Sequence, residues 1–233
     1  MANAGFGKMT DWFGMESAAL KLVSSDSGDT RSIVYASQVG KIAGVSDCGS
    51  EASGILRNPS CTYEVVANTT ITATLGAAWA AASGVSGYML TNVTIRTPFA
   101  AFPQVTFTAV ANEGANAINQ FAFSVPILAR ARPQNPLGAI SGGGDLQDFT
   151  LTASCDPVVL FEELMPCASD VTHGKLTASG TTAAYADEAA PTSENGFTFT
   201  AIPAIGGGVD YKTFTFNAEK GIRQWATTRV TAW

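Results

Sequence analysis

Apolar and polar residues alternate along two stretches of the chain that share one order of features. Val105 to Val125 reads VTFTAVANEGANAINQFAFSV, and Phe197 to Ala218, roughly ninety residues later, reads FTFTAIPAIGGGVDYKTFTFNA. In each stretch two alternating runs flank a turn segment rich in Gly or Asn, which is typical of a half-buried strand hairpin. We therefore predict a hairpin in each stretch. The aromatic residues expected in its core are Phe107, Phe121, Phe123, Phe199, Phe214 and Phe216.

Alternation of the same kind recurs through much of the remaining chain. CTYEVV, TITATLG and GYMLTNVTIRT precede the first predicted hairpin, FTLTAS and GKLTASG precede the second, and QWATTRVTAW ends the chain. Residues two apart in such a run share one face of a strand, so each run can bury an apolar face. The pattern predicts an all-β protein.

The order of these runs predicts two tandem, internally repeated β-sandwich or barrel-like domains. FTLTAS in the second half corresponds to TITATL in the first, and GKLTASG corresponds to NVTIRT. Between the halves lies a segment with two prolines and the triplet Gly142 to Gly144, which predicts a flexible linker. The expected divisions are an N-terminal arm at 1–35, a first β domain at 36–130, a linker at 131–147 and a second β domain at 148–233.

The first 35 residues lack sustained alternation but carry large apolar side chains, among them Phe6, Trp12 and Phe13. Such side chains are unfavourable when exposed, so the segment is expected to be packed. It would lie on its own domain, as a short helix near Met15 to Val23, or on a neighbouring subunit as an arm. We predict that Phe6, Trp12 and Phe13 contact another subunit of an oligomer.

A second short helix is predicted just after Asp156. Asp156 can cap a helix that starts at Pro157, and Pro166 would end it. Leu160, Phe161 and Leu164 would form its apolar side.

Charge is sparse and unevenly distributed. Only 14% of the residues are charged, and the net charge is −6. Nine acidic residues lie between Asp145 and Glu194, where Lys175 is the one base. A protein that grips nucleic acid needs the opposite sign, because phosphate neutralisation supplies most of that affinity. The composition argues against tight DNA binding.

The N-terminal sequence also bears on location. Lys8, Asp11 and Glu16 interrupt its apolar runs, so it lacks the continuous apolar core of a secretory signal. No apolar run approaches the roughly 20 residues that cross a bilayer. We expect synthesis in a cytoplasm and no membrane partner.

Catalytic and metal-binding constellations are not supported by residue count or spacing. His173 is the single histidine and no G-x-S-x-G motif is present, which disfavours a hydrolase, and His173 is expected at the surface before a strand. Glu162 and Glu163 are adjacent, so on a helix they would diverge rather than pair as in a glycosidase. The acids Asp145, Asp148, Asp187 and Glu188 do not form a calcium-binding loop motif. We predict no enzyme activity, no cofactor and no metal site.

The four cysteines leave two arrangements open. Their spacing would allow disulfides between Cys48 and Cys61 and between Cys155 and Cys167. In a reducing compartment all four would instead be small apolar core residues, which is the arrangement we expect.

The chain resembles bacteriophage virion proteins. The features that carry this resemblance are a duplicated β unit, an apolar arm, a Pro/Gly linker, low charge and the lack of a catalytic motif. The resemblance is closest to tail tube proteins with a duplicated tube domain, and the paired segments Thr70 to Val125 and Thr150 to Ala218 carry it. It implies a trimer or hexamer-like ring of copies, stacked into a conduit through which DNA passes without being gripped. It also implies contact with other virion proteins and assembly in the host cytoplasm.

Two other classes of protein remain open. Phage head decoration and fibre-type proteins are also built from β-sandwiches. A carbohydrate-binding or adhesion module is the third class, which an exposed aromatic platform would favour. The oligomer formed by the purified protein would discriminate among the three.

Overall fold

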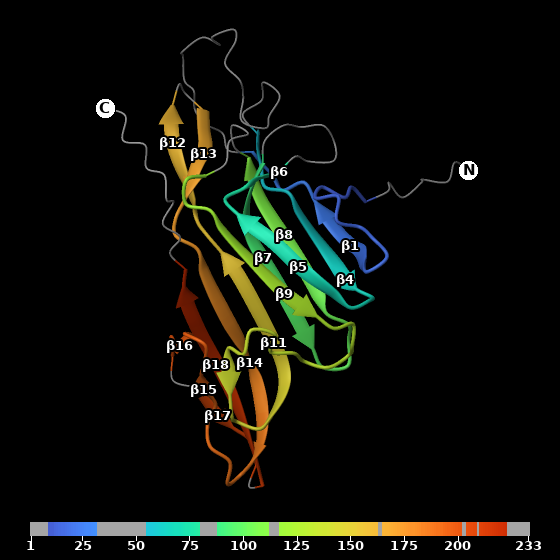
Figure 1. Ribbon diagram of the computed structural model, residues 1–233, viewed down its shortest axis with the longest axis vertical. Helices are drawn as coiled ribbons and strands as arrows, with labels where there is room; N and C mark the ends of the chain where they lie inside the picture. Colours follow the sequence, from blue (N-terminus) through green and yellow to red (C-terminus); the bar gives the residue numbers. More distant parts are fainter. Residues whose placement is uncertain are drawn as a thin grey trace, which may run out of the picture.

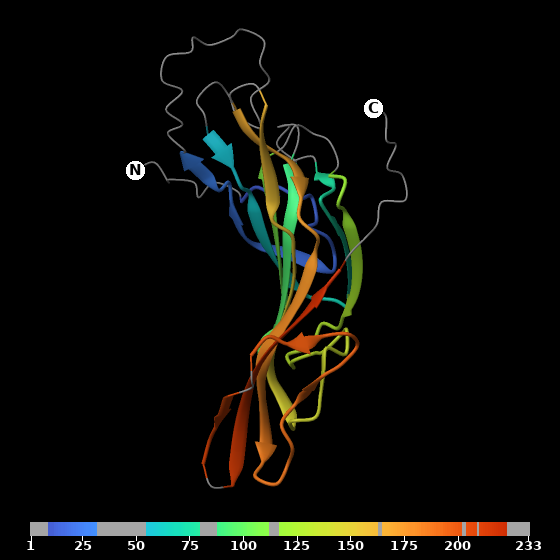
Figure 2. The same cartoon turned by 90° about the vertical axis from the view of Figure 1, so that its left-hand side faces the viewer.

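The computed structural model describes residues 9–31, 55–79, 88–111, 117–162, 165–201, 204–208 and 210–222. These residues form strands, turns and loops, and none of them lies in a helix. The predicted all-β class is confirmed. A large twisted sheet with a smaller layer packed on one face fits a β-sandwich (Figure 1, Figure 2).

One sheet of ten strands organises the described part of the chain. Its order is β1-β4-β8-β7-β11-β14-β18-β16, with β6 paired to β7 and β17 paired to β18, and the ladders are antiparallel. Its strands are β1 (Leu20–Asp26), β4 (Ser60–Val65), β6 (Ala78–Trp79), β7 (Tyr88–Pro98), β8 (Gln104–Ala111), β11 (Asp145–Ser154), β14 (Lys175–Tyr185), β16 (Thr198–Phe199), β17 (Ala204–Gly206) and β18 (Tyr211–Gly221).

The second layer is a pair of strands, β5 (Thr69–Leu75) and β9 (Phe121–Ile127), which lies over one face of the sheet (Figure 2). Ile71 and Phe121 from this layer share one core with Tyr63 and Phe107 from the large sheet. Full burial of each such side chain contributes roughly 1.5 to 3 kcal/mol, so the core holds the two layers together. Three further pairs join β2 (Asp29–Arg31) to β3 (Ile55–Arg57), β10 (Ile140–Ser141) to β15 (Thr192–Ser193), and β12 (Pro157–Glu162) to β13 (Met165–Val171).

Alternation along the strands corresponds to alternating burial, as predicted. In β9 the side chains of Phe121, Phe123, Val125 and Ile127 are buried and those between them are exposed. The burial pattern of β14 alternates in the same way. Of the six aromatic residues expected in the core, all are buried except Phe199, which is half-buried against the core.

The hairpin predicted from Val105 to Val125 is wrong. β8 pairs with β4 on one side and with β7 on the other, so neither of its edges is free for β9. The chain therefore crosses to the second layer, where β9 pairs with β5. Alternation specifies which side chains share a face, but it does not specify the neighbouring strand.

The second stretch does form a hairpin. β16 and β17, before the Gly-rich turn, both pair with β18. The two stretches therefore share a sequence pattern but occupy different topological positions.

Both predicted helices are wrong. The segment near Met15 to Val23 enters strand β1, and Pro157–Glu162 is strand β12, paired with β13. The β-branched Val158 and Val159 favour an extended chain, and Pro157 is tolerated as the first residue of a strand. These local preferences outweigh the capping signal of Asp156.

The large sheet runs across the boundary predicted between the domains. β7 from the first half pairs with β11 from the second half over seven residue pairs, from Asp148↔Pro98 to Ser154↔Asn92. The predicted linker at 131–147 contains β10 and the first residues of β11. The division into two domains stays a prediction. Strands from both halves belong to the same large sheet. The predicted last strand, QWATTRVTAW, lies outside the described residues, which end at residue 222.

Candidate functional site

The N-terminal segment is fastened to the core of its own chain. Phe13 is 5% exposed, and its ring centroid lies 5.7 Å from those of both Trp79 and Phe107. The indole N–H of Trp79 donates a hydrogen bond of 3.2 Å to the carbonyl oxygen of Phe13. Phe13 is thus an intramolecular core residue. Trp12 is half-buried against the same core, Phe6 lies outside the described residues, and a contact of either with another subunit stays a prediction.

Asp11 organises the turn that brings Phe13 inward. Its carboxylate accepts 2.9 Å hydrogen bonds from the backbone N–H groups of Gly14 and Glu16, and another from the Tyr63 hydroxyl. Burial acts to raise the pKa of Asp11, but these hydrogen bonds outweigh it and hold the pKa below its usual value. Burial and the bond to Asp11 raise the pKa of Tyr63. The cluster therefore consists of a carboxylate and a neutral phenol, and it stabilises the fold.

The described cysteines are buried and unreactive. Cys61 and Cys155 are free thiols, so neither forms one of the two disulfides that the spacing allowed. Burial raises the pKa of Cys61, and burial together with the charge of Asp156 raises that of Cys155 to about 12. Because the thiolate is the nucleophilic form, neither residue is suited to covalent catalysis. Cys48 and the side chain of Cys167 lie outside the described residues.

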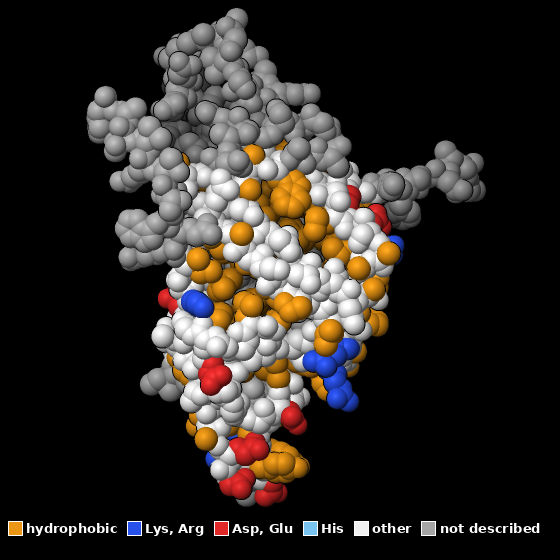
Figure 3. All heavy atoms as spheres, in the orientation of Figure 1, with side chains coloured by type: hydrophobic (Ala, Val, Ile, Leu, Met, Phe, Trp, Pro, Cys, Tyr) orange, Lys and Arg blue, Asp and Glu red, His pale blue; other side chains and the backbone are white. Residues whose placement is uncertain are grey.

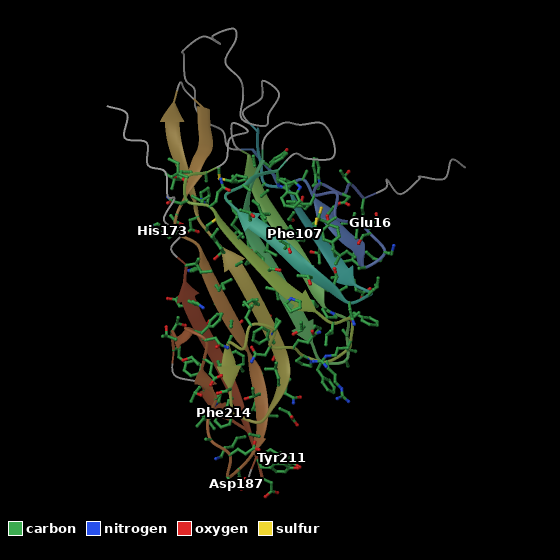
Figure 4. The ribbon with its side chains drawn as sticks, viewed as in Figure 1. Glu16, Phe107, His173, Asp187, Tyr211 and Phe214 are labelled. Carbon is green, nitrogen blue, oxygen red and sulfur yellow. The ribbon has the colours of Figure 1, made fainter. Side chains whose placement is uncertain are left out.

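The other candidate chemical residues lie apart from one another. His173 is exposed just before β14, as predicted (Figure 4). Asp170 accepts backbone hydrogen bonds of 3.1 and 3.2 Å from Ile118 and Asn119 and so fastens the turn before β9. Within the described ranges no three His, Cys, Asp or Glu side chains are grouped to hold a metal ion. Among the same residues there is no helix long and apolar enough to cross a membrane.

A hydroxyl-rich surface covers the face of the large sheet that points away from β5 and β9, and we call it the hydroxyl face. Its side chains are the polar members of each alternating strand, and they are exposed or half-buried. One row crosses five strands in register and includes two hydroxyl pairs, of which Thr62–Thr106 is 2.9 Å and Thr94–Thr152 is 3.3 Å between oxygens. The row runs through Thr62, Thr106, Thr94, Thr152 and Thr177.

Neighbouring rows of this face are also polar and nearly neutral. One contains Ser60, Thr108, Asn92, Ser154 and Lys175, and the other contains Glu64, Gln104, Arg96, Thr150, Ser179 and Asn217. Their charges are of both signs and are separated by hydroxyl or amide groups. The hydroxyl face therefore offers hydrogen-bonding groups without a strong field of either sign.

An aromatic pair ends this face at the lower tip of the molecule (Figure 4). Tyr185 and Tyr211 are cross-strand partners at the ends of β14 and β18, with ring centroids 5.4 Å apart. They are 62% and 59% exposed. Sequence reasoning missed this pair, although its signal was present: both tyrosines occupy the polar phase of strands whose other residues in that phase are small or polar.

No known protein-family model, curated protein or solved structure matches this chain.

Proposed function

We propose that the protein is a non-enzymatic structural subunit of a virion, a phage tail tube protein whose copies join into a ring-stacked conduit for DNA. The partners are copies of the same chain, in a trimer or hexamer-like ring, together with other virion proteins. Assembly takes place in the host cytoplasm, and DNA is a passing cargo that the protein does not grip.

The observation that carries the proposal is the hydroxyl face, which we assign to the lumen. Threonine side chains align across five strands there, and the charged residues that flank them include both acids and bases. Strong DNA binding requires clustered positive charge that displaces counterions from phosphates. A polar, nearly neutral wall instead hydrates the DNA and lets it slide.

The edges of the large sheet support assembly through strand pairing. In the described part of the chain, β1 pairs only with β4 at one edge, and β16 and β17 pair only with β18 at the other. An open edge presents N–H and C=O groups that a strand of another copy can complete. Joining the β1 edge of one copy to the β16–β17 edge of the next is a heterologous contact, and such contacts form a ring when the rotation between copies closes.

Electron microscopy of the purified protein tests the assembly. We expect hollow tubes with threefold or sixfold rings. A small closed trimer would favour a head decoration protein, and a stable monomer with hydrolytic activity would refute the proposal.

Thiol labelling tests which face lines the lumen. Thr94→Cys places a thiol on the hydroxyl face, and the matched control Thr72→Cys places one on the exposed outer side of β5. Both variants should react with a bulky maleimide as free subunits, above the wild-type background. In assembled tubes we expect the Thr72→Cys variant to react and the Thr94→Cys variant to be protected; equal labelling of both in tubes would contradict the lumen assignment.

A further inference from the structure

Two exposed surfaces of the described chain combine aromatic side chains with charge of opposite sign (Figure 3). The first, the acidic tip, consists of Tyr185 and Tyr211 with the exposed acids Asp187, Glu188 and Asp210. The second, the basic patch, lies on the β7–β8 turn and the segment after β9. It consists of Phe99, Phe102, Leu128, Arg130 and Arg132, which are all exposed.

The acidic tip has a fixed shape. Tyr185 and Tyr211 are cross-strand partners at the end of the β14–β18 ladder, and their ring planes are tilted by 33° to each other. The turn beyond Tyr185 is closed by a 3.0 Å hydrogen bond from the Glu188 N–H to the Tyr185 carbonyl, and the Ala186 N–H donates to the Asp210 carbonyl at 3.2 Å. The backbone of the turn that carries Asp187 and Glu188 is therefore hydrogen-bonded beside the paired rings.

The basic patch is also held in one shape, although it comes from two separate loops. The N–H of Ala100, between Phe99 and Phe102, donates a 3.3 Å hydrogen bond to the carbonyl of Ala131, between Arg130 and Arg132. Ala100 has φ of 61°, a conformation that costs a non-glycine residue free energy unless its surroundings impose it. The side chains of Phe99 and Phe102 on this turn are exposed.

The buried side chain of Gln134 fixes the second loop, which follows β9. The side-chain amide of Gln134 accepts from the Leu128 N–H at 2.9 Å and donates to the Leu128 carbonyl at 2.7 Å. The Gln134 N–H donates to the Thr97 hydroxyl at 3.0 Å, which ties this loop to β7. A surface that is ordered before binding loses little conformational entropy on binding, which favours a role as a docking site.

We propose that the acidic tip of one copy binds the basic patch of a second copy of this chain. The two surfaces carry opposite charge, and each offers two exposed aromatic rings that can be buried against the other surface. We choose a second copy as the partner because every copy of the chain carries both surfaces. The inference rests on the proposed function, because it supplies a contact by which subunits assemble.

The placement of the two surfaces determines the kind of assembly. The acidic tip lies at the lower end of the long axis, and a cluster of Lys and Arg side chains beside hydrophobic ones lies higher, on the right of the view in Figure 3. Because the surfaces are distinct, the contact is head-to-tail, and it leaves a free tip and a free patch for further copies.

The contact is small by the standards of stable interfaces. Four aromatic rings, each roughly half exposed, can bury on the order of 400 Å² between them, well below the roughly 1,600 Å² of a standard interface. A single contact is therefore weak, and it becomes effective only when repeated within an assembly.

Charge reversal at each surface tests the contact. One variant carries Asp187→Lys with Glu188→Lys, a second carries Arg130→Glu with Arg132→Glu, and a third carries all four changes. Self-association is measured by sedimentation velocity over a dilution series. We expect each double reversal to weaken self-association about tenfold or more and the fourfold variant to recover most of it, since charge pairs at interfaces couple strongly. Asp156→Lys with Glu194→Lys is the matched control for the first variant, with the same change in net charge at exposed positions elsewhere.

The outcomes separate this inference from the proposed function. If either double-reversal variant forms tubes as well as the wild type does, the tip-to-patch contact is overturned and the tail tube proposal still stands. A wild-type protein that stays monomeric would overturn both. Binding of a glycan that is lost in a Tyr185→Ser, Tyr211→Ser variant, with self-association unchanged, would identify the tip as a carbohydrate platform and overturn the contact.

Discussion

At the scale of single residues, the N-terminal segment depends on a few side chains that enter the core. Phe13 packs between Trp79 and Phe107 and is almost fully buried. We expect Phe13→Ala to lower the free energy of unfolding by about 3 to 5 kcal/mol, the usual cost of removing a buried aromatic ring. Urea denaturation would measure it. Phe102→Ala is the control, because Phe102 is 44% exposed and its truncation should cost little. Equal losses in both variants would contradict the packing described for Phe13.

Asp11 gives the same segment a pH dependence. Its pKa is lowered in the folded state, so it contributes stability that is fully present above its unfolded pKa, near 3.8, and is lost as the pH falls through the lower folded value. Asp11→Asn should therefore be less stable than the wild type at neutral pH. The difference between the two should shrink below pH 3.8. Denaturation midpoints measured across the acidic range would show it, and a difference that is constant with pH would contradict the role of the carboxylate.

At the scale of elements, two of the three consecutive glycines before β11 have different steric surroundings. Gly144 has φ of +82°, and a Cβ there would overlap the carbonyl oxygen of Ala183 in β14. Gly142 has φ of +73°, but the nearest atom to its Cβ would be 3.8 Å away. The triplet is thus a turn that lets the chain approach β14 closely.

Matched alanine substitutions separate strain from overlap. Gly142→Ala should cost about 1 to 2 kcal/mol of stability, the cost of a left-handed conformation for an L-residue. Gly144→Ala should cost more, by about 1 to 3 kcal/mol, because backbone atoms must also move. Urea denaturation of both proteins gives the comparison, and equal costs would show that the close approach to β14 does not matter.

The turn before β9 depends on Asp170 in β13. Its carboxylate accepts hydrogen bonds from the backbone of Ile118 and Asn119, and from the Asn119 side-chain amide at 3.3 Å. Asp170→Ala should lower stability by about 1 to 3 kcal/mol, since several donors lose their acceptor. Glu219→Ala, at an exposed position of β18, is the control and should be nearly neutral. Hydrogen exchange of the two backbone amides would place any loss at this turn.

At the scale of the whole molecule, two truncations separate folding from assembly. Deletion of residues 1–8 removes Phe6 and leaves Phe13 in place, so we expect a folded protein that assembles poorly if Phe6 contacts a neighbouring subunit. Deletion of residues 1–15 also removes Asp11 and Phe13, so it should destabilise the monomer itself. Thermal unfolding together with electron microscopy would distinguish these effects. Unimpaired tubes from the shorter truncation would show that Phe6 makes no assembly contact.

The sequence by itself determined the all-β class, about half of the described strands and the identity of the core. A period of two is a local property of an extended chain, so residues such as Phe107 and Phe121 are recognisable as core residues without knowledge of their partners. The side chains of the hydroxyl face follow from the same alternation, because Thr94 and Thr152 lie in the polar phase of their strands.

Only the tertiary structure decided which strands are neighbours and which surfaces come together. β8 was filled on both edges, so β9 crossed to the other layer, and β7 met β11 across the boundary between the halves. Strand pairing is a competition between distant segments for hydrogen-bonding edges, and local pattern carries little information about its outcome. For the same reason the Tyr185–Tyr211 pair, formed by residues from two strands, and the basic patch, formed by two loops, became visible only once the chain was folded.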